Sequence, residues 1–125
     1  MKDKNYKRIF DNRTIEELKA QYGYNVVLPK SNQLQVDIDD EESYALCMRR
    51  IEDIKEFTDW DFDWKETTSP GGNKHITITV QNKRFSQYER IALQCMFGSD
   101  RIREGLNALR HICGVENPVR FFEVL

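Results

Sequence analysis

The hydrophobic period of the chain changes twice between residues 34 and 80, and this constrains the fold more than any other feature. Residues 34–39 alternate between apolar and polar side chains, which is typical of a strand with one buried face. Residues 60–65 and 75–80 alternate in the same way. Between them runs an apolar stripe at helical spacing, made of Tyr44, Cys47, Met48, Ile51, Ile54 and Phe57. The sequence therefore predicts strand, helix, strand and strand in that order.

Helix signals flank this block on both sides. A capping box that begins at Thr14 predicts a helix ending near Tyr22, and residues 1–13 before it form either an arm or an ordered lead-in. A second capping box predicts a helix over residues 86–98, which ends at a glycine. Ser99 is the expected cap of the last helix, whose predicted apolar stripe is Ile102, Leu106, Leu109 and Ile112.

These elements predict a single α+β domain that spans residues 1–125. Their order matches the split β-α-β-β-α unit of RRM and ferredoxin-like folds, with an antiparallel sheet, helices on one face, an extra N-terminal helix and a C-terminal helix pair. Short strands are expected over residues 24–28 and 119–125. In this arrangement the second face of the sheet is open to ligands, and the alternation places Asp37 and Asp39 on it.

Composition narrows the class of protein. The formal net charge of −2 argues against a generic basic protein that coats DNA. The three cysteines, Cys47, Cys95 and Cys113, lack zinc-ligand spacing and are expected to be buried thiols, which fits a reducing compartment. A leader peptide and a bilayer-length apolar run are both absent from the sequence pattern, so we expect a cytoplasmic protein without a membrane partner.

Paired acids are the first candidate site. The carboxylates of Asp37 and Asp39 are predicted to project from one strand face, about 7 Å apart along the chain. This spacing suits two carboxylates that bind divalent cations together with substrate phosphates, although two acids on a solvated face are an equally simple interpretation. Asp61 and Asp63 repeat the spacing, where acids are the expected outer face of a strand that sends three aromatic side chains into the core: Trp60, Phe62 and Trp64.

The second candidate site is the turn at residues 69–75, which reads Ser-Pro-Gly-Gly-Asn-Lys-His. Glycines let backbone N–H groups approach an anion closely, and Lys74 and His75 supply charge or hydrogen-bond donors for phosphate. The simpler alternative is a plain β-turn with polar flanks.

Together, residues 34–39 and 69–75 resemble the catalytic motifs of the archaeo-eukaryotic primase superfamily, and most of all its small primase-polymerase domains from phages and plasmids. The resemblance implies that Asp37, Asp39 and His75 are catalytic and that the two acids hold Mg²⁺ or Mn²⁺. Asp100 is the nearest match to the third acidic ligand of that family. The residues that would contact the nucleotide are Ser69, Gly71, Gly72, Lys74 and His75.

The function implied by the resemblance is a nucleotidyltransferase that joins nucleoside triphosphates on nucleic acid, encoded by a phage in a bacterial host. Two alternatives stay open at this stage. A small accessory or inhibitor protein of phage type would act without catalysis, by binding a protein partner or nucleic acid. A metal-dependent nuclease would also use paired acids and a lysine.

Two further patterns bear on the chemistry of the chain. His75 begins a His-x-Thr element of the kind found in two-histidine phosphoesterases, but that chemistry needs a second copy and His111 does not supply one. Arginines gather near the C-terminus and predict either a phosphate-binding face or a solvated face: Arg84, Arg90, Arg101, Arg103, Arg110 and Arg120.

Overall fold

The computed structural model describes residues 24–115 and 117–124, so the predicted helix near residues 14–22 and the arm before it lie outside the described part. Within that part, no helix has both the length and the apolar character needed to cross a membrane. The elements are β1 (Tyr24–Val27), β2 (Gln33–Ile38), α3 (Glu41–Phe57), β3 (Phe62–Thr68), β4 (Lys74–Val80), α4 (Gln87–Met96), α5 (Arg101–Ile112) and β5 (Phe121–Val124).

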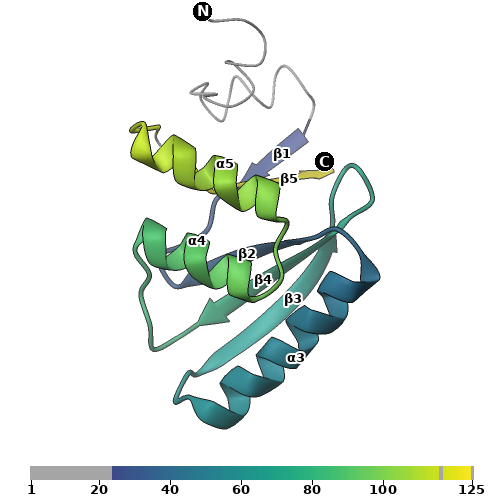
Figure 1. The fold of residues 1–125 in the computed structure, drawn as a ribbon, viewed down its shortest axis with the longest axis vertical. Coiled ribbons are helices and arrows are strands. Elements are labelled where there is room, and N and C mark those ends of the chain that lie inside the picture. The colour runs from purple at the N-terminus through teal and green to yellow at the C-terminus, as the bar shows by residue number, and fades with distance from the viewer. Residues whose placement is uncertain (1–23, 116, 125) are drawn as a thin grey trace, which may run out of the picture.

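The fold is α+β, as predicted, and its main sheet has the strand order β2-β4-β3 with both neighbouring pairs antiparallel (Figure 1). Strands β2 and β3 therefore run parallel to each other with β4 between them, which is the arrangement of a split β-α-β unit. The two short strands, β1 and β5, form a separate antiparallel ribbon.

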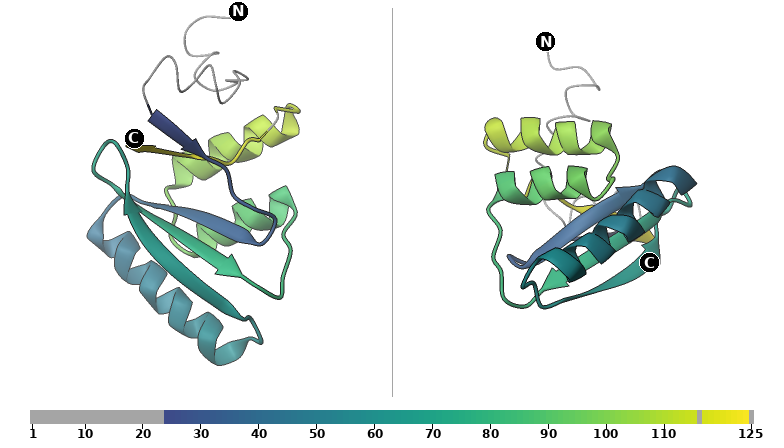
Figure 2. Two further views of the ribbon diagram at one scale, coloured as in Figure 1. Left: turned by 180° about the vertical axis from the view of Figure 1, so that it is seen from behind. Right: turned by 60° about the horizontal axis from the view of Figure 1, so that its bottom comes forward.

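The core lies between one face of the main sheet and two helices. Its sheet side consists of the apolar positions of the alternating strands, and α3 and α4 pack on that same face, as the sequence predicts. The buried members of the cluster are Leu34, Val36, Ile38, Cys47, Ile51, Ile76, Ile78, Val80 and Phe97. Helix α5 packs on α4, on the side away from the sheet (Figure 2).

Local signals explain where the helices begin. Asp40 caps α3 by accepting a hydrogen bond from the Ser43 backbone N–H at 2.7 Å. The predicted capping box of α4 is present in full, with Ser86 and Glu89 bonded to each other's backbone. The predicted cap of α5 is wrong, because Asp100 rather than Ser99 accepts the first backbone N–H groups of that helix.

Helix α5 also inverts its predicted faces. Ile102 and Ile112, which belong to the predicted apolar stripe, are 74% and 67% exposed, whereas Glu104 and Asn107 are buried. Two cysteine predictions fail as well, since only Cys47 is buried and the other two thiols are exposed. The aromatic strand β3 enters the core only in part, and Trp64 stays 39% exposed because β3 lies at the edge of the sheet.

The outer edge of β2 is closed by groups from α4 and α5 instead of by another strand. An unpaired strand edge would otherwise be open to aggregation. The backbone of Gln33, Gln35 and Asp37 is bonded in turn by Arg90 Nε (2.9 Å), Gln94 Oε1 (2.8 Å), Arg103 Nη1 (2.8 Å), Ser99 Oγ (3.0 Å) and the Asp100 backbone N–H (2.9 Å). Arg90 and Arg103 thus serve the β2 edge and belong to neither of the two arginine faces that were predicted.

Buried Glu104 holds these edge groups in place. It is 1% exposed, and its two carboxylate oxygens accept hydrogen bonds from four side chains. The donors are Gln94 (2.8 Å), Ser99 (2.6 Å), Arg103 (2.6 Å) and Asn107 (3.0 Å). A charge buried this deeply is tolerated because each lone pair has a donor and Arg103 balances the charge.

We predict that Glu104→Gln lowers the free energy of unfolding by about 3 kcal/mol or more, because the amide leaves Arg103 without its counter-charge and turns an –NH₂ group toward other donors. Chemical denaturation measures the loss. Glu56→Gln, an exposed change on α3, is the matched control and should cost less than about 0.5 kcal/mol. Equal stability of the two variants would contradict the role given to Glu104.

Candidate functional site

The first acid of the Asp-x-Asp strand and the hairpin histidine meet directly. Asp37 and His75 are cross-strand partners of β2 and β4, and Asp37 Oδ1 lies 3.6 Å from His75 Nε2. Both side chains point away from the core because their neighbours, such as Val36 and Ile76, fill it. The contact that the two sequence motifs require is therefore present.

The sheet face that carries this pair was predicted to be open, but that prediction is wrong, because β5 covers the face at this point. The Phe121 ring stacks on the His75 imidazole with centroids 3.8 Å apart and an interplanar angle of 7°. His75 is only 4% exposed, and the Asp37 side chain is 18% exposed. The Arg103 guanidinium lies 4.7 Å from the Phe121 centroid and completes the cover. Solvent reaches the site chiefly from the Asp37 side.

Burial sets the protonation chemistry of the pair. Loss of solvent, together with the positive charge of Arg103, lowers the pKa of His75 to about 4. Burial raises the pKa of Asp37, and the negative charges of Asp100, Asp39 and Glu104 add to the rise, whereas Arg103 opposes it. At neutral pH the imidazole is therefore uncharged, so its contact with Asp37 is not an ion pair.

Three buried polar atoms on this face have no hydrogen-bond partner among the residues that the structure describes: Gln35 Oε1, Asp37 Oδ1 and His75 Nδ1. Gln35 and Asp37 are alternate residues of β2, and His75 lies opposite Asp37. Most buried polar atoms in native proteins are bonded, so such a group is unusual. The free lone pairs of Asp37 Oδ1 fit the oxygen ligand that a divalent cation prefers.

Asp39 lies at the solvent-exposed end of β2 and links that strand to the hairpin. Its Oδ1 accepts a hydrogen bond from Asn73 Nδ2 at 3.2 Å. The next acid, Asp40, is committed to the N-terminus of α3. Asp39 is thus the exposed carboxylate beside the hairpin. Of the two predicted metal ligands, Asp37 and Asp39, it is the better placed for a ligand that arrives from solvent.

The glycine hairpin is a tight turn with an exposed tip. Ser69 Oγ accepts from the Asn73 backbone N–H at 2.9 Å, and the Ser69 carbonyl accepts from Gly72 N–H at 3.0 Å. Gly72 has φ of 89°, which a side chain rarely tolerates, so glycine is required there. The hydroxyl of Ser69 therefore maintains the turn, while Gly71 and Gly72 stay exposed.

Lys74 and His75, which were grouped as nucleotide-binding residues, lie on opposite faces of the sheet. The Lys74 ammonium sits 4.1 Å from the centroid of the Tyr44 ring, on the face that α3 covers. Neighbouring residues of a strand point to opposite sides, so the two cannot contact one phosphate from the same face. Lys74 is nevertheless exposed at the strand end, close to the turn.

Asp100, the predicted third acidic ligand, caps the N-terminus of α5 beside Asp37, and its backbone N–H donates to the Asp37 carbonyl at 2.9 Å. Its carboxylate accepts from the backbone N–H groups of Ile102 and Arg103 at the start of α5. Over residues 24–115 and 117–124, no group of three or more His, Cys, Asp or Glu side chains is arranged to hold a metal ion.

Sequence reasoning missed Gln35, Arg103 and Phe121 as parts of the site. Gln35 could have been found, because alternation puts it on the same strand face as Asp37. Phe121 and Arg103 come from distant segments, and no local pattern links them to His75.

We predict that His75 makes the apoprotein sensitive to mild acid. Because its folded pKa of about 4 lies below its ordinary 6.5, the unfolded chain binds the proton first, and stability falls as pH drops from about 6.5 toward 4. Between about pH 7.5 and pH 5 the loss from this group is about 2 kcal/mol. The raised pKa of Asp37 has the opposite effect on stability as pH falls. The quantity to compare is therefore the difference in unfolding free energy between wild type and His75→Gln, measured in chelator-treated samples.

Denaturation at several pH values should show a flatter curve for His75→Gln than for wild type. His111→Gln, a change at the other histidine of the chain, is measured beside it to separate the effect of His75 from the loss of a histidine as such. Identical slopes in all three proteins would show that His75 is not buried in its neutral form.

Comparison with known proteins yields no match among the family models, the curated proteins or the solved structures searched.

Proposed function

We propose that the protein is a primase-like domain that binds a nucleotide and a divalent cation, Mg²⁺ or Mn²⁺, and acts on nucleic acid. The observation that supports this is the contact of Asp37 with His75 beside the exposed Asp39, in which Asp37 keeps an oxygen with free lone pairs. The order of motifs, acid strand first and glycine-hairpin histidine second, is that of the primase superfamily.

In this proposal Asp37 and Asp39 hold the cation, which when bound would offset the charge of the nucleotide phosphates. The exposed hairpin lies next to Asp39 through the Asn73 amide and would contact the phosphates with the backbone of Gly71 at its tip, since the Gly72 N–H already donates to the Ser69 carbonyl. Lys74 would add positive charge from the strand end. Its ammonium is held over Tyr44, so it would act as a nearby charge rather than as a direct partner of His75.

We predict that Mn²⁺ together with a nucleoside triphosphate raises the melting temperature of the protein, because a ligand that binds only the folded state stabilises it by mass action. At a ligand concentration about 100 times Kd the gain is about 2.7 kcal/mol. Asp39→Asn should remove the shift while leaving the unliganded melting temperature nearly unchanged, since Asp39 is exposed. Differential scanning fluorimetry and calorimetric titration measure both quantities.

Asp63→Asn is the matched control, because Asp63 is an exposed acid of the other Asp-x-Asp segment and lies away from His75. It should retain the full shift. A shift that survives Asp39→Asn, or that the control variant also loses, would refute the proposed ligand site. Primer synthesis from nucleoside triphosphates, tested with the same variants, separates catalysis from binding alone.

A second function is favoured by one specific observation, the Phe121 ring stacked on His75, which leaves the imidazole 4% exposed. A buried histidine cannot contact substrate without movement of β5. The alternative is a non-catalytic accessory or inhibitor protein that binds a protein partner or nucleic acid. It predicts no thermal shift with Mn²⁺ and nucleotide in wild type or in either variant, and no primer synthesis.

A further inference from the structure

The two edges of the main sheet are treated differently. The β2 edge is closed by side chains of α4 and α5, as described above, whereas β3 pairs with β4 and with no other strand among the described residues. Most of β3 is exposed, including Asp63, Trp64, Lys65 and Glu66. An open strand edge of this length is a template for pairing with another strand.

The hydrogen bonds at both ends of β3 fix which of its residues face outward. The carbonyl of Asp61 accepts from Gln81 N–H at 2.6 Å, and Ser69 N–H donates to the Asn73 carbonyl at 2.7 Å. Odd-numbered residues therefore bond inward to the β4 hairpin. Because backbone direction alternates along a strand, the N–H and C=O groups of even-numbered residues, such as Trp64 and Glu66, point outward.

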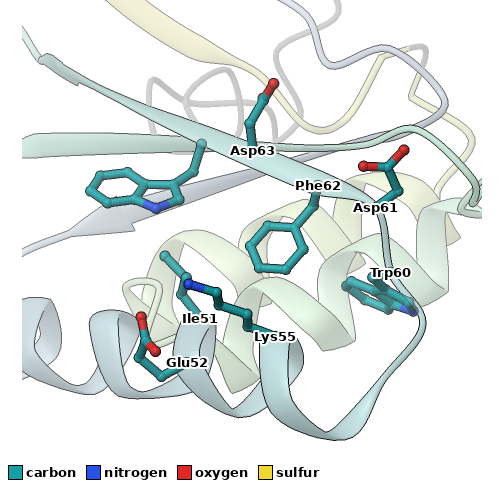
Figure 3. Close-up of a pocket in the computed structure, with 8 residues that line it drawn as sticks. Ile51, Glu52, Lys55, Trp60, Asp61, Phe62 and Asp63 are labelled. Carbon is teal, nitrogen blue, oxygen red and sulfur yellow. The ribbon is translucent and has the colours of Figure 1, made fainter.

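Side chains divide along β3 in the same alternating way. Phe62 points toward α3, whereas Asp61 and Asp63 point away from it (Figure 3). The hollow between α3 and β3 that these residues line also includes Trp60 and Trp64. The β3 edge thus offers aromatic groups on its α3 side and charged groups, Asp63 and Lys65, on the other side.

We infer that the β3 edge binds the β3 edge of a second copy of this chain, in an antiparallel and isologous dimer. Pairing outward groups with outward groups requires even residues to face even residues, so the two-fold axis must pass through one residue and its own copy. Five interior positions of β3 are available: Asp63, Trp64, Lys65, Glu66 and Thr67.

Charge favours one of these five registers. An axis at Thr67 brings no pair of opposite charges together, because it sets Glu66 opposite Thr68 and Lys65 opposite Ser69. An axis at Asp63, Lys65 or Glu66 sets that residue against its own copy, so that like charges face each other, which is destabilising. An axis at Trp64 instead places the two Trp64 residues opposite each other, and it places each Asp63 opposite Lys65 of the second copy. The strand is therefore self-complementary in a single central register, with an aromatic pair flanked by two pairs of opposite charge.

The partner at the β3 edge is a second copy of this chain because the strand is complementary to itself. A strand that accepts an unrelated extended peptide has no need to balance its own charges about one residue. In the dimer the two sheets would join through β3 into one continuous sheet, with Trp64 of each copy beside the hollow next to α3. This inference concerns a different surface from the Asp37–His75 site and stands whether or not the proposed function is correct.

The experiment is a charge reversal followed by its compensation, with the dimer dissociation constant measured by sedimentation velocity over a wide range of concentrations. Lys65→Asp sets acid against Asp63 on both sides of the axis and should weaken dimerisation about tenfold or more. The double variant Asp63→Lys with Lys65→Asp exchanges the two charges and should restore wild-type affinity. Lys30→Asp, the same charge change at an exposed position outside β3, should have no effect.

Thermal unfolding of each variant checks that the fold is intact. We expect it to be intact, because the substituted positions are exposed. A wild-type protein that stays monomeric at the highest concentration overturns the inference. So does a dimer whose affinity is unchanged by Lys65→Asp, because its interface is then elsewhere. A double variant as weak as Lys65→Asp overturns the Trp64-centred register.

Discussion

The buried ion pair of Glu104 with Arg103 is the interaction on which the rest of the structure depends. Glu104 orients the donors that close the β2 edge, and Arg103 reaches from this pair to the Gln35 carbonyl. The same guanidinium lies against Phe121, which in turn covers His75. The pair therefore joins the packing of α5 to the geometry of the candidate site, so that damage to one is felt in the other.

Much of the fold follows from the sequence because alternation and helical period are local signals. The order β2-α3-β3-β4 and the apolar sheet face were predictable in this way, and the capping box at Ser86 marked the start of α4. The cap at Asp40 was not predicted. The buried face of α5 was not predictable. A stripe of isoleucine and leucine at helical spacing normally marks the side of a helix that packs on the core, but in α5 the buried side is the one that carries Glu104. Glu104 is buried because four donors from distant positions meet it, and no local pattern encodes that.

In the candidate site, too, the features set by local sequence pattern were predictable and those set by tertiary packing were not. The meeting of Asp37 with His75 was predictable, since both lie off the apolar face of strands that were expected to share a sheet. The separation of Lys74 from His75 follows from strand alternation, which the grouping of both as phosphate ligands overlooked. The cover supplied by Phe121 depends on how the β1–β5 ribbon crosses the sheet, which is a tertiary property.

The stacking of Phe121 on the imidazole would lower the apparent affinity of any ligand that uses His75. Such a ligand can bind only molecules in which the C-terminal strand has moved aside, so its apparent affinity is the intrinsic one reduced by the fraction of molecules in that form. Loosening the ribbon would then tighten binding without adding a single contact. For such a ligand, β5 would be an intramolecular competitor, because Phe121 occupies the face of the imidazole that the ligand would need.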